Sequence, residues 1–250
     1  MIDTHCHILK DYYDNIDEVI NNMDGYIINS GYDDNSNLEV IESVNKYNNV
    51  YGVIGIQPEE LNKMTDDTYN IIESNMNNPK IVGIGEIGLD YHWDDSNKEE
   101  QKKVFRKMLD IANKYNKPVV IHSRDAHQDT FDILKEYKDI KGVLHCYSGS
   151  LELAREYIKM GYMLGIGGVL TFKNSKKLAE IVKDIPLEYL LLETDSPYLS
   201  PEPFRGKTNY PNYIEFVARK IAEIKDISYE DVIKVTTMNA IRQFDLNIEV

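Results

Sequence analysis

The chain of 250 residues is poor in cysteine, in tryptophan and in long apolar runs. Its two cysteines, Cys6 and Cys146, are too few for a disulfide scaffold, and the absence of a Cys-x-x-Cys pair excludes a structural zinc finger. We interpret both as small buried apolar residues. No apolar stretch approaches the roughly 18 residues of a membrane helix, and the first residues lack the pattern of a secretion signal. We therefore expect a cytoplasmic protein without a membrane partner, and no obligate protein partner is evident.

Positive charge is also scarce, because 28 Lys and Arg face 42 Asp and Glu, giving a formal net charge of -14. Surfaces that bind nucleic acid along their whole extent are usually basic, so this balance argues against such a surface. A local site is compatible with it, since a metal pair and a few placed Arg and Lys can hold a phosphodiester inside an acidic molecule.

Short buried segments alternate with amphipathic ones along the whole chain. Eight segments have the pattern of strands: residues 1–7, 26–28, 50–56, 80–86, 118–122, 142–145, 162–166 and 189–193. Helical spacing of apolar residues lies between them, for example over 97–115 and 130–137, and two helices follow the last strand. Apolar strands separated by helical crossovers indicate a parallel sheet. Eight such units predict a single-domain (β/α)8 TIM barrel over residues 1–250.

The spacing Gly83-x-Gly85-x-x-Gly88 matches the fingerprint of dinucleotide-binding proteins. That fingerprint requires a helix directly after its strand. Here the glycines lie within and just past the fourth predicted strand, and the next helix begins only near residue 97. The barrel is therefore favoured over an open dinucleotide-binding sheet.

Metal-competent side chains lie at the ends of the predicted strands, where the active sites of such barrels are found. In the first strand, alternation puts Asp3, His5 and His7 on one face, with Asp3 as a candidate supporting group behind the two imidazoles. The predicted ligands are His5, His7, Glu86, His122, His145 and Asp195. Each has an ordinary structural explanation when taken alone. Together they form a suitable set for two divalent ions that share a carboxylate.

These strand ends stand in motifs that resemble the TatD family of metal-dependent deoxyribonucleases, within the amidohydrolase-like barrels. The matching segments are residues 2–7 (IDTHCH), 85–91 (GEIGLDY), 118–126 (PVVIHSRDA), 145–149 (HCYSG) and 192–197 (LETDSP), with Arg205, Gly206, Lys207 and Asn209 following in the family's order. The resemblance runs nearly end to end. It implies that His5, His7 and Asp195 hold one ion, that His122 and His145 hold the second, and that Glu86 bridges them.

The resemblance further implies a nuclease that uses two divalent ions, Mg, Mn or Zn, and takes DNA as its substrate, cleaved from its ends. Glu86 occupies the bridging place that a carbamylated lysine has in many amidohydrolases, which favours the nuclease branch. We expect Asp195 and Glu86 to be the catalytic residues, with Asp195 as general base. The residues expected to contact phosphate are Arg205, Lys207 and Arg124.

One departure from the family pattern follows the third predicted strand. The family commonly has Gly-x-His-Pro there, whereas this chain has Gln57 before Pro58. Gln57 can hydrogen-bond a phosphate or a water but cannot be protonated. We expect Gln57 and His92 to line the pocket. Tyr210 stands where the family often has Glu, which is a smaller departure.

Two other functions remain open at this point. One is hydrolysis of a C–N or C–O bond in a substrate other than DNA, including the ester of aminoacyl-tRNA. The other is a barrel that binds a ligand without turnover, which predicts a broken ligand set.

Overall fold

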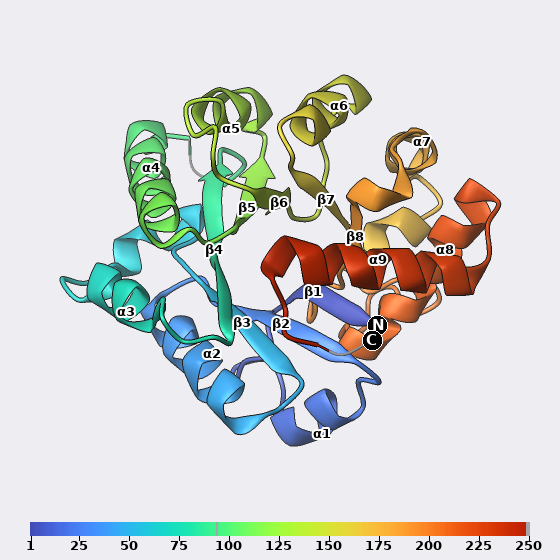
Figure 1. Cartoon of the computed structure of the whole chain (residues 1–250), viewed down its shortest axis with the longest axis horizontal. Helices are drawn as coiled ribbons and strands as arrows, with labels where there is room; N and C mark the ends of the chain where they lie inside the picture. Colours follow the sequence, from blue (N-terminus) through green and yellow to red (C-terminus); the bar gives the residue numbers. More distant parts are fainter. Residues whose placement is uncertain (94, 249–250) are drawn as a thin grey trace.

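The computed structural model describes residues 1–93 and 95–248, and it confirms the predicted barrel. Eight parallel strands pair in chain order around one sheet, with helices outside it (Figure 1). The strands are β1 Ile2–Cys6, β2 Tyr26–Ser30, β3 Val50–Ile54, β4 Ile81–Asp90, β5 Val119–Arg124, β6 Gly142–Leu144, β7 Met163–Ile166 and β8 Leu190–Leu192. Because all strands run the same way, their carboxyl ends meet at one rim of the barrel.

The helices alternate with the strands as expected. The α-helices are α1 Ile16–Asn21, α2 Asp34–Lys46, α3 Thr68–Asn75, α4 Lys98–Tyr115, α5 His127–Leu134, α6 Leu151–Lys159, α7 Lys176–Asp184, α8 Ile214–Lys225 and α9 Tyr229–Phe244. Short 3-10 turns lie at η1 Pro58–Lys63, η2 Gly168–Thr171, η3 Leu187–Tyr189 and η4 Pro211–Tyr213. Several helices begin at a capping side chain, as α9 does, where Ser228 accepts a hydrogen bond from the Asp231 backbone N–H.

Two predicted boundaries were wrong. The helix expected over 130–137 is α5, which begins at His127, because the Ala126 carbonyl already accepts a hydrogen bond from the Thr130 N–H at 2.9 Å. Strand β4 was expected to end at residue 86 but continues to Asp90, pairing Gly88 with His122 on β5. Gly88 has φ of +145°, and a Cβ there would lie 1.9 Å from the His122 carbonyl oxygen. Glycine at this position therefore allows β4 and β5 to approach closely, although in the sequence a glycine here indicates the end of a strand.

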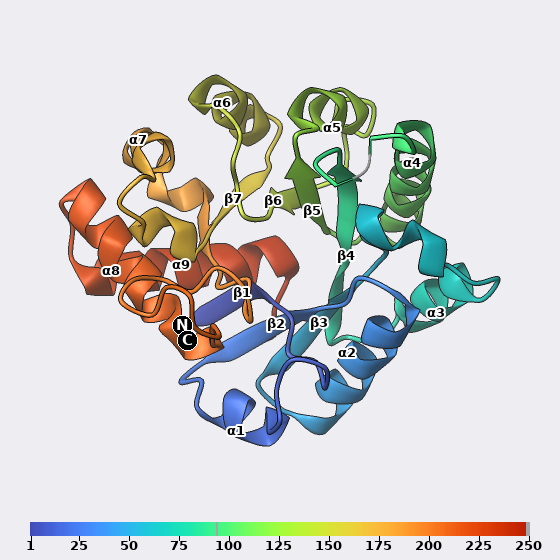
Figure 2. The ribbon, with the colours of Figure 1, turned by 180° about the vertical axis from the view of Figure 1, so that it is seen from behind.

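The barrel is closed where the segment after β8 meets β1. The Asp195 N–H donates to the His5 carbonyl at 2.9 Å, and the His7 N–H donates to the Ser196 carbonyl at 2.7 Å. The Thr4 hydroxyl adds a bond to the Leu192 carbonyl at 2.9 Å. Figure 2 shows this segment running beside β1. Residues almost 190 positions apart along the chain therefore share one rim.

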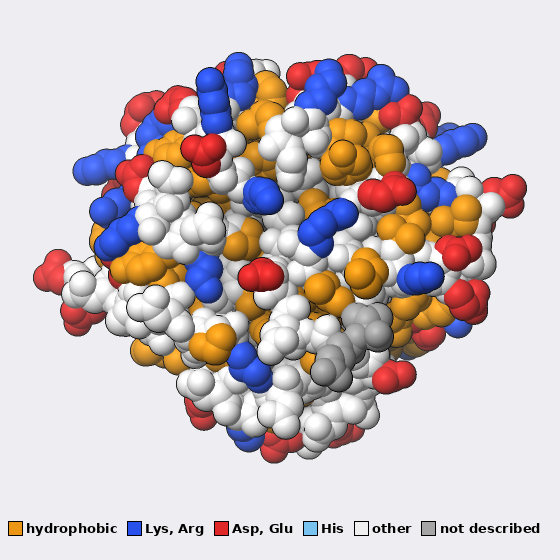
Figure 3. All heavy atoms as spheres, in the orientation of Figure 1, with side chains coloured by type: hydrophobic (Ala, Val, Ile, Leu, Met, Phe, Trp, Pro, Cys, Tyr) orange, Lys and Arg blue, Asp and Glu red, His pale blue; other side chains and the backbone are white. Residues whose placement is uncertain are grey.

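The opposite end of the barrel is sealed by apolar side chains. Every strand contributes to this inner cluster, which comprises Ile2, Ile28, Tyr51, Val53, Val82, Val120, Val143, Met163 and Leu191 together with Ala240, Phe244 and Leu246. Ala240 and Phe244 lie on α9, and Leu246 follows that helix. The helix α9 lies across this end of the barrel in Figure 1. Figure 3 views the same side and shows charged side chains of both signs scattered over it. The predicted metal-binding residues lie at the other end of the strands.

Among the described residues, no helix has the length and apolar character needed to cross a membrane.

Phe244 anchors α9 in the inner cluster, where its side chain is 2% exposed. Replacing it with Ala leaves a cavity at the sealed end, and we expect unfolding free energy to fall by about 3–5 kcal/mol. Urea denaturation followed by circular dichroism measures this loss. Met238→Ala, on the same helix at a half-exposed position, is the matched control and should change stability by no more than about 0.5 kcal/mol. Equal losses of stability from the two substitutions would contradict a stabilising role for Phe244 in the apolar cluster.

Candidate metal centre

The structure brings all six predicted donors together at the carboxyl ends of the strands. Their nitrogen and oxygen atoms form three overlapping sets in which all ligand atoms lie within 4.8 Å of one another. The sets are His5, His7 and Glu86; Glu86, His122 and His145; and His5, His145 and Asp195. Glu86 belongs to two sets, so one carboxylate faces both histidine pairs.

Glu86 is the centre of the arrangement and is 2% exposed. Its Oε1 lies 2.8 Å from His122 Nδ1 and 3.2 Å from His145 Nε2. Its Oε2 lies 3.5 Å from the Nε2 atoms of both His5 and His7. Burial acts to raise the pKa of this carboxyl, but the surrounding imidazoles outweigh burial and hold the pKa well below its usual range. The group is therefore an anion enclosed by nitrogen atoms.

Local strand geometry turns Glu86 toward the histidines. The sequence placed Glu86 at the end of the fourth strand, whereas the structure places it inside β4. The pairing of β4 with β5 shifts register between Ile84 and Ile87, and the Glu86 N–H instead donates to the Gly31 carbonyl at 2.9 Å. Such irregularities re-aim a side chain within a strand and are common next to active sites.

His5 and His7 face each other through their Nε2 atoms, which are 3.2 Å apart. Ser30 on β2 holds both rings: its carbonyl lies 2.9 Å from His7 Nδ1, and its hydroxyl lies 3.0 Å from His5 Nδ1. Because a carbonyl only accepts, the proton of neutral His7 is on Nδ1, and the lone pair of Nε2 points into the centre. Two lone pairs this close repel unless a cation or proton lies between them. The pair therefore fits a metal ion.

The pKa values of the two rings shift in opposite directions although both rings are buried. Burial lowers the pKa of His5. At His7, the carboxylates of Asp195 and Glu86 outweigh the effect of burial and raise the pKa. Asp195 Oδ1 lies 3.7 Å from His5 Nε2 and 3.6 Å from His7 Nε2. Asp195 thus completes this half of the centre.

Asp195 owes its position to the closing segment of the barrel. Its φ of +54° lies in the left-handed region, which Asp tolerates better than most residues. Asp3, the expected supporting group, fixes Thr194, the residue before Asp195. The Asp3 Oδ1 atom accepts hydrogen bonds from the N–H groups of Thr194 at 3.0 Å and His5 at 3.3 Å. Asp3 therefore supports the backbone on both sides of the β1 and β8 junction rather than an imidazole.

Each of the other two histidines has beside it a carboxylate that sequence reasoning missed. His122 Nε2 lies 2.8 Å from Asp90 Oδ2, and His145 Nδ1 lies 3.5 Å from Glu193 Oε1. At His122 burial favours the neutral ring, but hydrogen bonds to Asp90 and Glu86 raise its pKa to about 9. Both acids stand inside the motif segments noted above, and that position was the signal that could have identified them.

Glu193 is fully buried beneath His145. Its Oε1 accepts the N–H of Cys146, a half-buried residue rather than the buried one we expected. On the far side, a Cβ on Gly165 would lie 2.1 Å from Glu193 Oε2, so the carboxylate occupies the space that a side chain there would take. Among the described residues Oε2 has no hydrogen-bond partner. Glycine on β7 and the Cys146 N–H together leave Glu193 facing the ring.

The residues expected to contact phosphate or line the pocket lie around the centre rather than in it. Arg124, Arg205 and Lys207 are exposed, and their cationic groups lie over the rings of Trp93, Phe172 and Phe204 at 5.2, 4.3 and 5.9 Å from the ring centroids. Gln57 donates to Glu59 at 3.1 Å, and His92 Nδ1 lies 3.0 Å from Asp125. All of these lie at the carboxyl end of a strand or on the segment that follows one, so they belong to the same rim.

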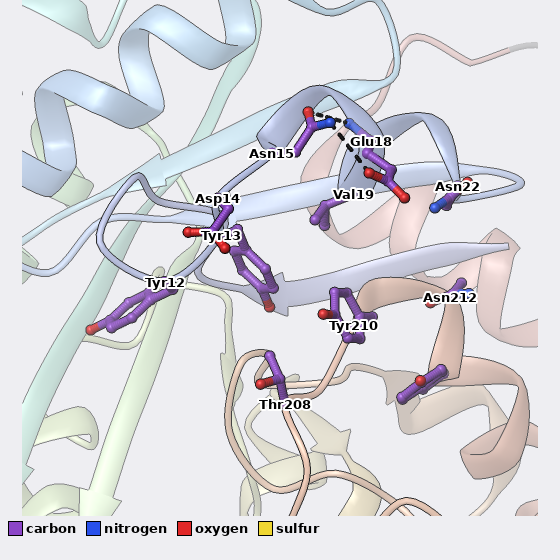
Figure 4. Close-up of a pocket in the computed structure, with 11 residues that line it drawn as sticks. Tyr12, Tyr13, Asp14, Asn15, Glu18, Val19, Asn22, Thr208, Tyr210 and Asn212 are labelled. Atoms are coloured by element: carbon purple, nitrogen blue, oxygen red, sulfur yellow. Dashed lines mark hydrogen bonds between the residues drawn. The ribbon is translucent and has the colours of Figure 1, made fainter.

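A cleft of about 460 Å³ lies between the segment after β1, with the α1 helix that follows it, and the segment after β8 (Figure 4). The rings of Tyr13 and Tyr210 lie 5.5 Å apart in it. Tyr210 thus fills with an aromatic ring the place where the resemblance leads one to expect a carboxylate. Asp14 and Glu18 supply the acidic groups of the lining.

A parallel (β/α)8 barrel with histidine and carboxylate donors gathered at its carboxyl rim is typical of metal-dependent hydrolases. The family model described as TatD related DNase matches residues 2–245. The chain belongs to this family.

Individual relatives agree with this assignment. The Bacillus subtilis protein named "Uncharacterized metal-dependent hydrolase YabD" is 42% identical over 254 residues, covering 99% of this chain and 100% of that protein. "Uncharacterized metal-dependent hydrolase MJ1582" of Methanocaldococcus jannaschii is 38% identical over 250 residues, covering 97% and 96%. The crystal structure of YJJV, a TatD homolog from Escherichia coli, has a TM-score of 0.91 at 28% identity and covers 98% of both chains.

The position of Glu193 generates a prediction about metal affinity. Glu193→Gln keeps the shape of the side chain but removes the charge behind His145, and loss of such a partner typically weakens metal binding about 10–100-fold. Calorimetric titration of the metal-free protein with Mn²⁺ or Zn²⁺ measures this without any substrate. We expect two ions to bind the unaltered chain and one of them to bind the variant more weakly.

Glu188→Gln is the matched control, since Glu188 is exposed on η3. It should leave both affinities unchanged. Two ions bound to Glu193→Gln with unaltered affinity would contradict a supporting role for Glu193.

Proposed function

We propose that this hydrolase cleaves phosphodiester bonds of DNA, removing nucleotides from its ends. The observation that carries the proposal is the sharing of Glu86 between two sets of donors. A shared carboxylate suits two ions a few ångströms apart, the arrangement used for in-line displacement at phosphorus. His5, His7 and Asp195 would hold one ion, and His122 and His145 the other.

The donor set fits divalent ions of borderline hardness. Imidazole nitrogen favours Zn and related transition metals, whereas carboxylate oxygen also suits Mg and Mn. Ions bound there would polarise a phosphoryl oxygen and lower the pKa of a water nucleophile. Ser30 and Asp90 orient three of the four imidazoles by hydrogen bonds, and Glu193 lies 3.5 Å from the fourth, His145. Hydrogen bonds of this kind fix the rings, which reduces the cost of ordering the site.

The chain offers Asp195 as the group that accepts a proton. Glu86 is less suitable, because both of its oxygens already face imidazole nitrogens. The Asp195 side chain is 14% exposed, so it reaches the solvent side of the centre. Burial acts to raise its pKa, but His7 and the other imidazoles outweigh that effect and lower it. Asp195 is therefore ionised at neutral pH and able to take a proton at a carboxylate oxygen.

Phosphate recognition falls to the cations of the rim. Arg124, Arg205 and Lys207 are exposed around the centre, where guanidinium groups can hold phosphate oxygens in pairs. Because the net charge is -14, attraction to a polyanion is local to this rim rather than general.

A second candidate is cleavage of the ester of aminoacyl-tRNA. The cleft of Figure 4 carries Asp14 and Glu18 and has neither Lys nor Arg in its lining. Such a lining suits an ammonium group better than a phosphate. The same centre serves either ester.

A side-by-side assay separates the two. The metal-free protein is titrated with Mg²⁺, Mn²⁺ or Zn²⁺ and incubated with end-labelled single- and double-stranded DNA and with aminoacyl-tRNA. Release of labelled nucleotides from DNA at a rate well above deacylation supports the nuclease. Deacylation without nucleotide release overturns it in favour of the second candidate.

Asp195→Asn tests the proton acceptor. Because the amide cannot accept the proton and is a poorer ligand, we expect kcat on a labelled oligonucleotide to fall by about 10²–10⁴-fold or more. The midpoint of thermal unfolding should stay close to that of the unaltered chain. Asp139→Asn, at an exposed position between α5 and β6 at the sealed end, should retain full activity. Full activity in Asp195→Asn would remove this residue from the mechanism.

A further inference from the structure

Two large aromatic side chains are exposed at the rim although the proposed mechanism uses neither. Trp93 is 68% exposed and Tyr198 is 48% exposed. Water contact with so much aromatic surface is unfavourable unless a ligand covers it. Each of these residues is attached to a different half of the metal centre.

Trp93 is tied to the His122 half. Its backbone N–H reaches Asp90 Oδ1 at 3.4 Å, and Oδ2 of the same carboxylate lies 2.8 Å from His122 Nε2. The Arg124 guanidinium lies 5.2 Å from the Trp93 ring centroid. The Asp90 carboxylate therefore connects the Trp93 backbone to His122, a predicted ligand. The Arg124 guanidinium lies beside the indole.

Tyr198 is tied to the His7 half. Its backbone N–H donates to the Asp195 carbonyl at 2.8 Å, and its ring centroid lies 6.3 Å from that of His7. The Tyr198 hydroxyl donates to Tyr12 at 2.8 Å, and Tyr12 in turn contacts the Tyr32 hydroxyl at 3.0 Å. This chain of hydroxyl groups fixes the ring, so little rotational freedom remains to be lost when a ligand stacks on it.

We propose that Trp93 and Tyr198 are stacking subsites for two nucleobases, one on each side of the metal centre; this rests on the proposed action on nucleic acid. Arg124 then holds a phosphate next to the base on Trp93. Stacking is the interaction this molecule needs, because a protein of net charge -14 has little general attraction for a polyanion. Aromatic stacking is tolerant of base identity, since every base has a π face. Inside a duplex both faces of a base are covered by its neighbours, so these subsites favour unpaired or terminal bases.

Binding without turnover tests the proposal. A fluorescein-labelled hexathymidylate and an abasic hexamer with the same phosphates are titrated with protein in EDTA, and anisotropy gives both affinities. We expect the thymidylate to bind the unaltered chain about 10-fold more tightly or better, and Trp93→Ala and Tyr198→Ala each to reduce that ratio about 5-fold or more. Trp93→Phe and Tyr198→Phe, which keep a ring, should retain most of it.

Met238→Ala is the matched control, because Met238 is half-exposed on α9 at the sealed end. It should bind both oligonucleotides as the unaltered chain does. Equal affinity of the unaltered chain for the two oligonucleotides, or ratios unchanged in both alanine variants, would overturn the stacking subsites.

Trp93 is the single tryptophan of the chain, so its fluorescence reports directly on this subsite. Hexathymidylate should quench it, whereas the abasic hexamer should not, and identical responses would overturn the Trp93 subsite. Hydrolysis of methyl p-nitrophenyl phosphate by the metal-loaded unaltered chain tests the proposed function separately. Hydrolysis without base-dependent binding refutes the subsites alone. Base-dependent binding without hydrolysis of this ester or of DNA refutes the proposed function alone.

Discussion

The architecture depends on one buried anion, the Glu86 carboxylate. Placing a carboxylate inside a barrel is costly unless cations or hydrogen-bond donors surround it, and here four imidazoles do so. Those imidazoles come from β1, β5 and the residues just after β1 and β6, so the requirement reaches across most of the rim. The irregular pairing of β4 directs the carboxylate inward. A change of one residue in that register would turn the side chain to the other face.

The two ends of the barrel differ in chemistry. At one end, side chains from every strand and from α9 form a sealed apolar cluster. At the other, closure of β8 onto β1 brings Asp195 beside His5 and His7. Stability and function are thus supplied by different ends of the same strands. Gln57 and Tyr210, where this chain departs from the pattern that the resemblance implies, both follow strands and lie outside that apolar cluster.

The supporting groups of the histidines are unequal. Ser30 holds His5 and His7 with neutral atoms, whereas Asp90 and Glu193 place a carboxylate behind His122 and His145. A carboxylate makes an imidazole a more basic ligand than a carbonyl does. The two halves of the centre consequently differ in charge. The same Asp90 also anchors the backbone of Trp93, which links the metal centre to the surface where substrate would bind.

Much of this molecule was determined by its sequence alone. Alternating apolar segments defined the barrel, and the six donors were recognised because each stands at or near the end of such a segment, which is a local property. Sequence could not show that β4 continues to Asp90, because Gly88 resembles a strand end until His122 packs against it. It also could not pair Glu193 with His145 or Tyr198 with His7, because those contacts depend on the register of strands distant in the chain. Tertiary structure decided which groups support the donors and which surround them.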